Sequence, residues 1–288
     1  MAKFHLSAFA DEAGGGLLSQ IEALKANGFT HIEPRGLDDG NISYFTAEQA
    51  KNVKKILDEN NIGVSAIGSG FGKIKITEDF KEHFEAFKQC VENAHILGTQ
   101  NIRMFSFFIP DGDDPAIYRD EVFERLDIMS DYAYKDGIFC CHENEKEIYG
   151  DTAERCLEIL TTFKGKIKGV FDPANFIQCH VETVPAFDML EEYIEYMHVK
   201  DCRMADGFVV PCGKGDGHVE ELLRRFSKKD GDRFLTLEPH LKVFDGIKDL
   251  ETNGGKGTIR EAYEYPTNRD AFNAACDAFK EVLDKAMA

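Results

Sequence analysis

The chain has 288 residues, and 43% of them are hydrophobic, which is enough for a large core. Its formal net charge of −18 argues against a nucleic-acid partner, because a phosphate-binding surface needs a dense basic patch. No stretch approaches the ~18 consecutive apolar residues of a membrane span. The eight cysteines include no C-x-x-C pair, and the first residues lack a cleavable signal pattern. We therefore expect a cytoplasmic protein with reduced cysteines and no membrane partner.

Short apolar segments alternate with longer amphipathic segments along the chain. We expect eight strands, at residues 4–10, 30–33, 63–68, 101–107, 138–145, 167–172, 196–200 and 233–238. Helices are expected at residues 17–26, 47–59, 78–97, from beyond Pro115 to 134, 152–163, from the turn with Pro185 to 193, 218–226 and 269–285. A long polar loop separates the last strand from the last helix.

This alternation predicts an α/β fold with parallel strands. Eight strand–helix units favour a single (β/α)8 TIM barrel, with outer helices around an eight-stranded parallel barrel, over an open sheet. The alternative is a doubly wound sheet, whose phosphate-binding turn follows the first strand. The glycines at 14–16 lie too far beyond that strand and lack the G-x-G-x-x-G spacing. No change of composition marks a linker, so we expect one domain over residues 1–288.

Four of the expected strands have, at or near their carboxyl ends, a residue that can bind a metal. These residues are Glu143, Asp172, His198 and Glu238. In a parallel barrel the carboxyl ends of the strands meet at one face, where active sites lie, and residues two apart share a side. Three carboxylates and one imidazole suit one divalent ion: Mn²⁺, Mg²⁺, Co²⁺ or Zn²⁺. The absence of cysteine from the set disfavours a structural zinc site.

The same strand ends resemble a known family. Glu143-Asn144, Phe-Asp-Pro-Ala-Asn at 171–175, His-Val-Lys-Asp at 198–201 and Leu-Glu-Pro-His at 237–240 are similar to the xylose isomerase-like barrel superfamily, in its sugar phosphate isomerase/epimerase branch. The resemblance implies that the four residues above are the metal ligands. It also implies that Glu143 and Glu238 are the catalytic acid and base, on opposite faces of the substrate carbon.

The resemblance predicts a metal-dependent sugar or sugar phosphate isomerase or epimerase. The reaction would transfer a proton through a metal-stabilised enediolate. The alternative is a lyase that dehydrates a keto-inositol or eliminates from a 3-keto sugar, because both reactions begin with the same proton abstraction. Asn175, in place of an expected His, and the acidic chain disfavour a DNA-repair endonuclease of the superfamily. A non-catalytic barrel is disfavoured because both glutamates are present.

Further residues at or beyond the strand ends are candidate substrate contacts: Asn175, Lys200, Arg203, His240, Glu33, Arg35, Arg103, His142 and Glu145. Asn175 stands where related epimerases place a substrate-binding His. His142 faces away from the barrel axis if its strand stays regular, but with Glu145 it is also a candidate extra acid or base.

The expected partner is a small sugar. Related barrels are commonly dimers or tetramers, which leaves a homo-oligomer open. The glycine-rich segment 213–217 fits a tight loop over the substrate better than a phosphate-binding loop, because Asp216 would oppose an anion.

Overall fold

The computed structural model describes residues 1–38, 40–244 and 265–288. Six strands form one curled parallel sheet, in the order β1-β12-β9-β8-β7-β6. Their bounds are β1 (Ala2–Ala8), β6 (Asn101–Met104), β7 (Phe139–Glu143), β8 (Ile167–Phe171), β9 (Ile194–Val199) and β12 (Gly231–Leu237). The prediction of parallel strands in the sheet is confirmed.

Strands β2 (His31–Ile32) and β5 (Gly63–Val64) form a separate parallel pair. Two backbone hydrogen bonds link this pair and its flanking residues to the sheet on each side. On one side the amides of Thr30 and Glu33 donate to the carbonyls of Leu6 and Ala8, at 3.4 and 3.1 Å. On the other side the amide of Ile67 donates to the carbonyl of Asn101 at 2.9 Å, and the amide of Arg103 donates to the carbonyl of Ile67 at 3.0 Å. All eight expected strands therefore occur in the described residues, but the continuous sheet that these residues form has six.

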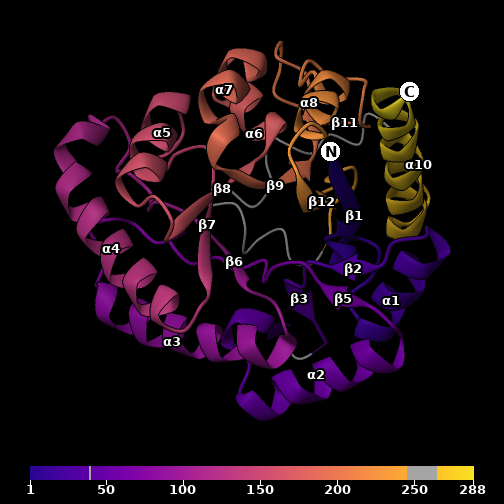
Figure 1. Cartoon of the computed structure of the whole chain (residues 1–288), viewed down its shortest axis with the longest axis horizontal. Helices are drawn as coiled ribbons and strands as arrows, with labels where there is room; N and C mark the ends of the chain where they lie inside the picture. The colour runs from indigo at the N-terminus through magenta and orange to yellow at the C-terminus, as the bar shows by residue number, and fades with distance from the viewer. Residues whose placement is uncertain (39, 245–264) are drawn as a thin grey trace.

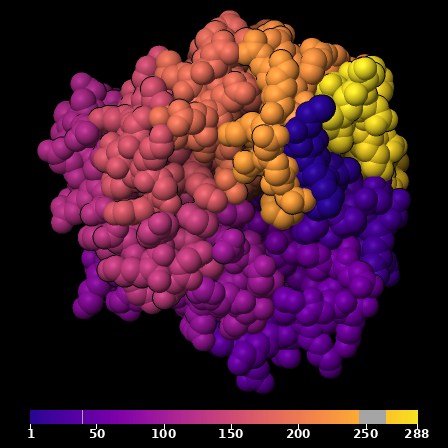
Figure 2. Space-filling view, viewed as in Figure 1, coloured from indigo at the N-terminus to yellow at the C-terminus, as the bar shows by residue number. Residues whose placement is uncertain are grey.

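The helices surround the strands as an outer ring (Figure 1). Their bounds are α1 (Leu17–Ala26), α2 (Ala47–Glu59), α3 (Phe80–Leu97), α4 (Arg119–Lys135), α5 (Ala153–Thr162), α6 (Pro173–Gln178), α7 (Thr183–Leu190), α8 (Val219–Phe226) and α10 (Asn268–Met287). Figure 2 shows that the indigo N-terminal residues lie against the orange residues near 230 and the yellow helix α10. The two ends of the described chain therefore lie side by side.

Local capping signals explain most helix starts. Thr46 and Gln49 form a capping box at the start of α2, and Thr152 caps α5. Helix α3 begins two residues later than expected because Asp79, whose side chain accepts a hydrogen bond from the Lys81 amide, is its cap.

Several short elements were not predicted. Helix α6 begins where the Asp172 side chain accepts a hydrogen bond from the amide of Asn175, so a candidate metal ligand is also a helix cap. The first strand begins and ends two residues earlier than expected, at Ala2–Ala8. A 3₁₀ turn, η1 (Ala10–Glu12), follows it. Two small hairpins extend beyond strand ends: β3 (Gly36–Leu37) with β4 (Gly40–Asn41), and β10 (Asp201–Cys202) with β11 (Val209–Val210).

The apolar residues form two buried clusters that show which way the strands face. The large cluster includes the buried apolar residues of the helices. The small one holds Ala66, Cys141, Val170 and Tyr196. The last three lie two residues before Glu143, Asp172 and His198, so these ligand candidates point to the same side as the small cluster.

Two further expectations concern the state of the cysteines and the ability of the helices to cross a membrane. All eight cysteines lie in the described part and are free thiols. Each helix of that part is too short or too polar to cross a lipid bilayer.

Candidate active site

The four predicted metal ligands meet at the carboxyl ends of β7, β8, β9 and β12. One ligand atom from each of Glu143, Asp172, His198 and Glu238 lies within 4.8 Å of the others. All four side chains are buried. Nδ1 of His198 is 2.9 Å from Oε1 of Glu143 and 3.8 Å from Oε2 of Glu238. The ring therefore presents Nδ1 to the carboxylates.

The donor set fits a divalent metal. Oε2 of Glu143 and Oδ2 of Asp172 are buried, and neither makes a hydrogen bond. Their neighbouring cations are Nη1 of Arg103, 3.3 Å from the glutamate oxygen, and Nζ of Lys200, 2.9 Å from the aspartate oxygen. A buried carboxylate oxygen that makes no hydrogen bond destabilises the folded state, and coordination to a metal cation offsets this free-energy cost. Oxygen ligands with one imidazole suit Mn²⁺, Mg²⁺, Co²⁺ or Zn²⁺.

Each candidate catalytic glutamate has its own arginine. Nη1 of Arg35 is 3.2 Å from Oε1 of Glu238, and Nη1 of Arg103 is 3.3 Å from Oε2 of Glu143. Both guanidinium groups lie over the fully buried ring of Phe9, at 4.4 Å and 4.9 Å from its centroid. Phe9 therefore supports the two cations that orient the two glutamates.

The side chain of Lys200 lies between two of the candidate metal ligands, Asp172 and Glu238. Its Nζ is 2.9 Å from Oδ2 of Asp172 and 2.8 Å from Oε2 of Glu238. Burial lowers the pKa of Lys200, but the two carboxylates raise it well above the ordinary value. Burial raises the pKa of Asp172, and the ammonium of Lys200 opposes that change. Lys200 is therefore a charged group in the ligand cluster.

Two asparagines hold the ends of β7 and β8 together. The side chain of Asn144 accepts from the amide of Asp172 and donates to its carbonyl, both at 2.9 Å. Nδ2 of Asn175 donates to Oε1 of Glu143 at 3.1 Å and to the carbonyl of Asn144 at 2.9 Å. Asn175, predicted as a substrate contact, thus also positions a candidate ligand.

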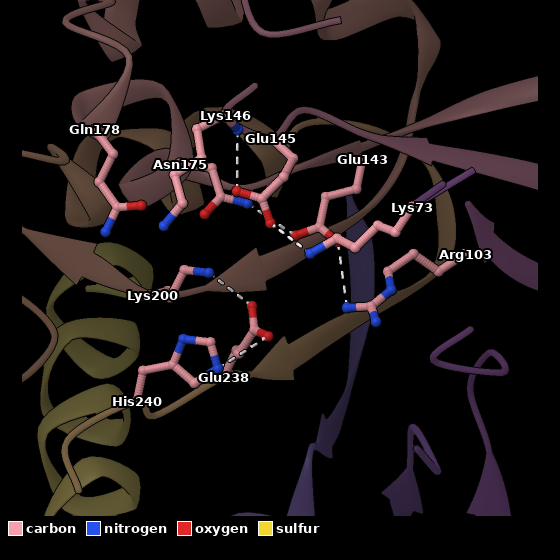
Figure 3. Close-up of a pocket in the computed structure, with 10 residues that line it drawn as sticks. All are labelled: Lys73, Arg103, Glu143, Glu145, Lys146, Asn175, Gln178, Lys200, Glu238 and His240. Atoms are coloured by element: carbon pink, nitrogen blue, oxygen red, sulfur yellow. Dashed lines mark hydrogen bonds and ion pairs between the residues drawn. The ribbon is translucent and has the colours of Figure 1, made fainter. Parts of the chain in front are cut away.

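A pocket opens beside the ligand cluster, and polar side chains line it (Figure 3). The lining residues are Lys73, Arg103, Glu143, Glu145, Lys146, Asn175, Gln178, Lys200, Glu238 and His240. Glu145 is 2.9 Å from Nζ of Lys73. Burial raises the pKa of Glu145, but Lys73, Lys146 and Lys200 lower it to about 2. The pocket therefore has an ionised carboxylate in addition to the two candidate catalytic glutamates.

His240 contributes a neutral imidazole to this pocket. Its Nε2 is 3.4 Å from Oε1 of Glu238 and 3.4 Å from Oε1 of Glu12. Burial lowers the pKa of His240 well below the ordinary value. Its backbone has a φ of 45°, an uncommon conformation for a residue other than glycine.

Glu12, Glu238 and His240 are a second group with metal-ligand spacing in the described part of the chain. The guanidinium of Arg35 already lies 3.4 Å from Glu12 and 3.2 Å from Glu238. The two groups share Glu238, and the four-residue cluster offers the larger set of ligands, so we expect one metal ion there.

Four predicted substrate contacts do not line the pocket. One is Arg35, which pairs with Glu238 at 3.2 Å. His142 is buried on the other side of β7, where its Nε2 lies 2.9 Å from Oγ of Ser106, and burial lowers its pKa to about 3. Arg203 is 43% exposed and pairs with Asp206. Glu33 is fully buried behind His198. His142 lies outside the pocket because side chains alternate regularly along β7, which turns His142 away from Glu143.

The glycine-rich loop after β11 is organised by a single carboxylate. The amides of Gly213, Gly215 and Gly217 donate to Asp201 at 2.8, 3.0 and 3.0 Å. These amides are therefore used within the loop and are not directed at a phosphate. The close approach of Asp201 also leaves no room for a Cβ atom at Gly215 or Gly217.

Several residues of the site were not predicted. Asp11 accepts two hydrogen bonds from Arg35, and Glu12 contacts His240. Both follow the first strand, so the strand-end rule that found Glu143 could have found them. Lys73 and Gln178 lie in irregular or newly found elements, and no periodic pattern marks them.

The chain belongs to the family described as xylose isomerase-like TIM barrel, whose model matches residues 21–281. This match confirms the resemblance drawn from the strand-end motifs. A comparison with curated proteins finds no match.

Solved structures show the same fold. The chain is similar to the probable 3-DHS dehydratase AsbF from Bacillus anthracis, at 18% identity and a TM-score of 0.72, over 97% of this chain and 99% of that one. It is similar to the IOLI protein with a bound zinc atom, at 16% identity and a TM-score of 0.74, over 98% of each chain. A D-psicose 3-epimerase from Clostridium cellulolyticum H10 matches at 14% identity and a TM-score of 0.70, over 97% and 99%. At these identities the similarity shows the fold alone.

Proposed function

We propose that this protein is a divalent-metal-dependent isomerase or epimerase of a sugar or sugar phosphate. The observation that carries the proposal is the pairing of Glu143 and Glu238, which line one polar pocket beside the ligand cluster and are each oriented by an arginine. We also propose that residues 1–288 form one domain, in which β2 and β5 complete an eight-stranded barrel.

The roles of the chain's own groups follow from their positions. A divalent ion bound by Glu143, Asp172, His198 and Glu238 would polarise the substrate carbonyl and offset the negative charge formed next to it. One glutamate removes the proton from the neighbouring carbon, and the other returns a proton from the opposite face. The two arginines align the two glutamates. Lys200 and His240 are placed to hold substrate hydroxyl groups.

The experiment that tests this proposal is proton NMR in D₂O with metal-loaded protein. The substrates are free ketohexoses, their phosphates, a keto-inositol and a 3-keto glucoside. We expect deuterium at the carbon next to the carbonyl and a new epimer or aldose. Glu143→Gln and Glu238→Gln should each lower the rate at least ~100-fold, the usual contribution of a positioned acid or base, with unchanged circular dichroism. A fully active Glu238→Gln protein would contradict the mechanism.

A second candidate is a lyase that uses the same proton abstraction. It is favoured by a pocket group beyond the two glutamates, the ammonium of Lys73 paired with Glu145, which is placed to protonate a leaving group. One structurally similar protein is named a probable dehydratase. In the same NMR assay, an unsaturated product with loss of water or of the aglycone would establish this reaction instead.

A further inference from the structure

The two ring nitrogens of His198 face different carboxylates. Nδ1 faces the ligand cluster, at 2.9 Å from Glu143. Nε2 lies 3.3 Å from both Oε1 and Oε2 of Glu33. The His198 and Glu33 side chains are fully buried, so neither ring nitrogen is exposed to bulk solvent. Glu33 directly follows β2, on the far side of the imidazole from the candidate metal.

A third residue holds Glu33 in place. The hydroxyl of the fully buried Tyr196 donates to Oε1 of Glu33 at 3.0 Å. The ring of Tyr196 also lies edge-on to that of His198, with centroids 5.5 Å apart. Phe9 meets the same imidazole edge-on, at 5.1 Å. The orientation of His198 is therefore determined by packing on its faces and by a carboxylate at Nε2.

We infer that Glu33 is a positioning residue that fixes the ring of His198 with its proton on Nε2, so that the lone pair of Nδ1 is directed at the metal. This inference rests on the proposed metal centre and adds a residue to it. A neutral imidazole can coordinate through one nitrogen only if the other carries the proton. A carboxylate that accepts this proton orients the ring and increases the basicity of the coordinating nitrogen. Glu33 thus acts through His198 and does not contact the substrate.

The first test is zinc affinity, measured by competition with a chromogenic chelator. Loss of such an outer carboxylate typically weakens metal binding ~10–100-fold. Glu33→Gln keeps a weaker acceptor, so its loss of zinc affinity should lie near the lower end of that range. Glu33→Met has no acceptor, so its loss should lie near the upper end. Tyr196→Phe removes only the hydroxyl that holds Glu33 and leaves the carboxylate, so it should weaken zinc binding less than either Glu33 variant.

The second readout is one that a purely structural role would not change. In zinc-loaded protein with ¹⁵N-labelled histidine, we expect a downfield ring N–H proton on Nε2 of His198, protected from exchange with water. The signal is assigned by its loss in His198→Gln. In Glu33→Gln it should move upfield and exchange faster. If Glu33→Met does not fold, Glu33→Gln and Tyr196→Phe still provide both measurements.

The outcomes separate this inference from the metal centre itself. If His198→Gln weakens zinc binding while both Glu33 variants bind within twofold of the wild type, Glu33 does not position the ligand and the inference is overturned. A ring proton found on Nδ1 would overturn it as well. If His198→Gln binds zinc as tightly as the wild type, the proposed metal centre fails, and the inference fails with it.

Discussion

Lys200 shows how one residue can link stability to metal binding. Its ammonium lies within 3 Å of Asp172 and Glu238, and all three side chains are almost fully buried. Removing one partner of a buried ion pair leaves an uncompensated charge, which costs about 3–5 kcal/mol. A divalent ion bound to the same carboxylates would supply the missing charge.

We therefore predict that Lys200→Met lowers the free energy of unfolding of metal-free protein by about 3 kcal/mol, and that saturating Mn²⁺ recovers most of the loss. Urea denaturation with and without the metal measures both effects. The control is Lys164→Met, whose ion pair with Glu192 is exposed to solvent, so its loss should change the unfolding free energy far less. Equal losses in the two variants, or no recovery with metal, would count against the role of Lys200.

At the scale of elements, the loop after β11 depends on Asp201, which is 1% exposed and accepts three glycine amides. Asparagine has one acceptor oxygen, so Asp201→Asn leaves at least one donor poorly paired. We predict a loss of about 2 kcal/mol in unfolding free energy. Asp216→Asn is the control, because its exposed side chain accepts one amide, that of Met204, and the amide oxygen can replace it. Thermal unfolding measures the loss of unfolding free energy in the two variants. An equal loss in both would contradict the proposed role of Asp201 in the loop.

The loop that carries Lys73 is attached to α3 through His83. Nε2 of His83 accepts a hydrogen bond from the amide of Gly72 at 2.9 Å, and the ring packs edge-on against Phe71. Burial, assisted by Arg125, lowers the pKa of His83 to about 4. In the unfolded chain a histidine has a pKa of ~6.5. Between these two values the unfolded chain binds a proton that the folded chain excludes, so stability falls as the pH decreases.

We predict that the wild type loses about 2 kcal/mol more unfolding free energy than His83→Gln between pH 7.5 and pH 4.5. Urea denaturation at the two pH values gives this difference, and the other titrating groups cancel in the comparison. Parallel pH dependence in the two proteins would show that His83 is not buried as a neutral ring.

Element positions were predictable where a repeated pattern marks them. The strands that end at Glu143 and Asp172 are short apolar segments between helix signals, and strand alternation correctly turned His142 away from Glu143. The exact starts and ends were less predictable. Helix α6 is six residues long, and its cap, Asp172, was interpreted only as a strand end.

For the whole molecule, the family and the parallel arrangement were predictable from the alternation of strands and helices and from the strand-end motifs. The pairing of strands was not, because β2 and β5 are two residues long and few backbone hydrogen bonds link them to the sheet. The cation–carboxylate pairs that surround the ligand cluster were not predictable either. Arg35 and Glu238 are 203 positions apart, so only the folded chain brings them together.

We propose that residues at four strand ends bind one divalent metal. Diffraction at the zinc absorption edge tests this binding directly. Crystals grown with Zn²⁺ should show one strong anomalous peak per chain. We predict this peak ~2.0–2.2 Å from Nδ1 of His198 and from carboxylate oxygens of Glu143, Asp172 and Glu238. A peak near Glu12 and His240 instead, or no peak in the cluster with Lys200 still between its carboxylates, would contradict the account.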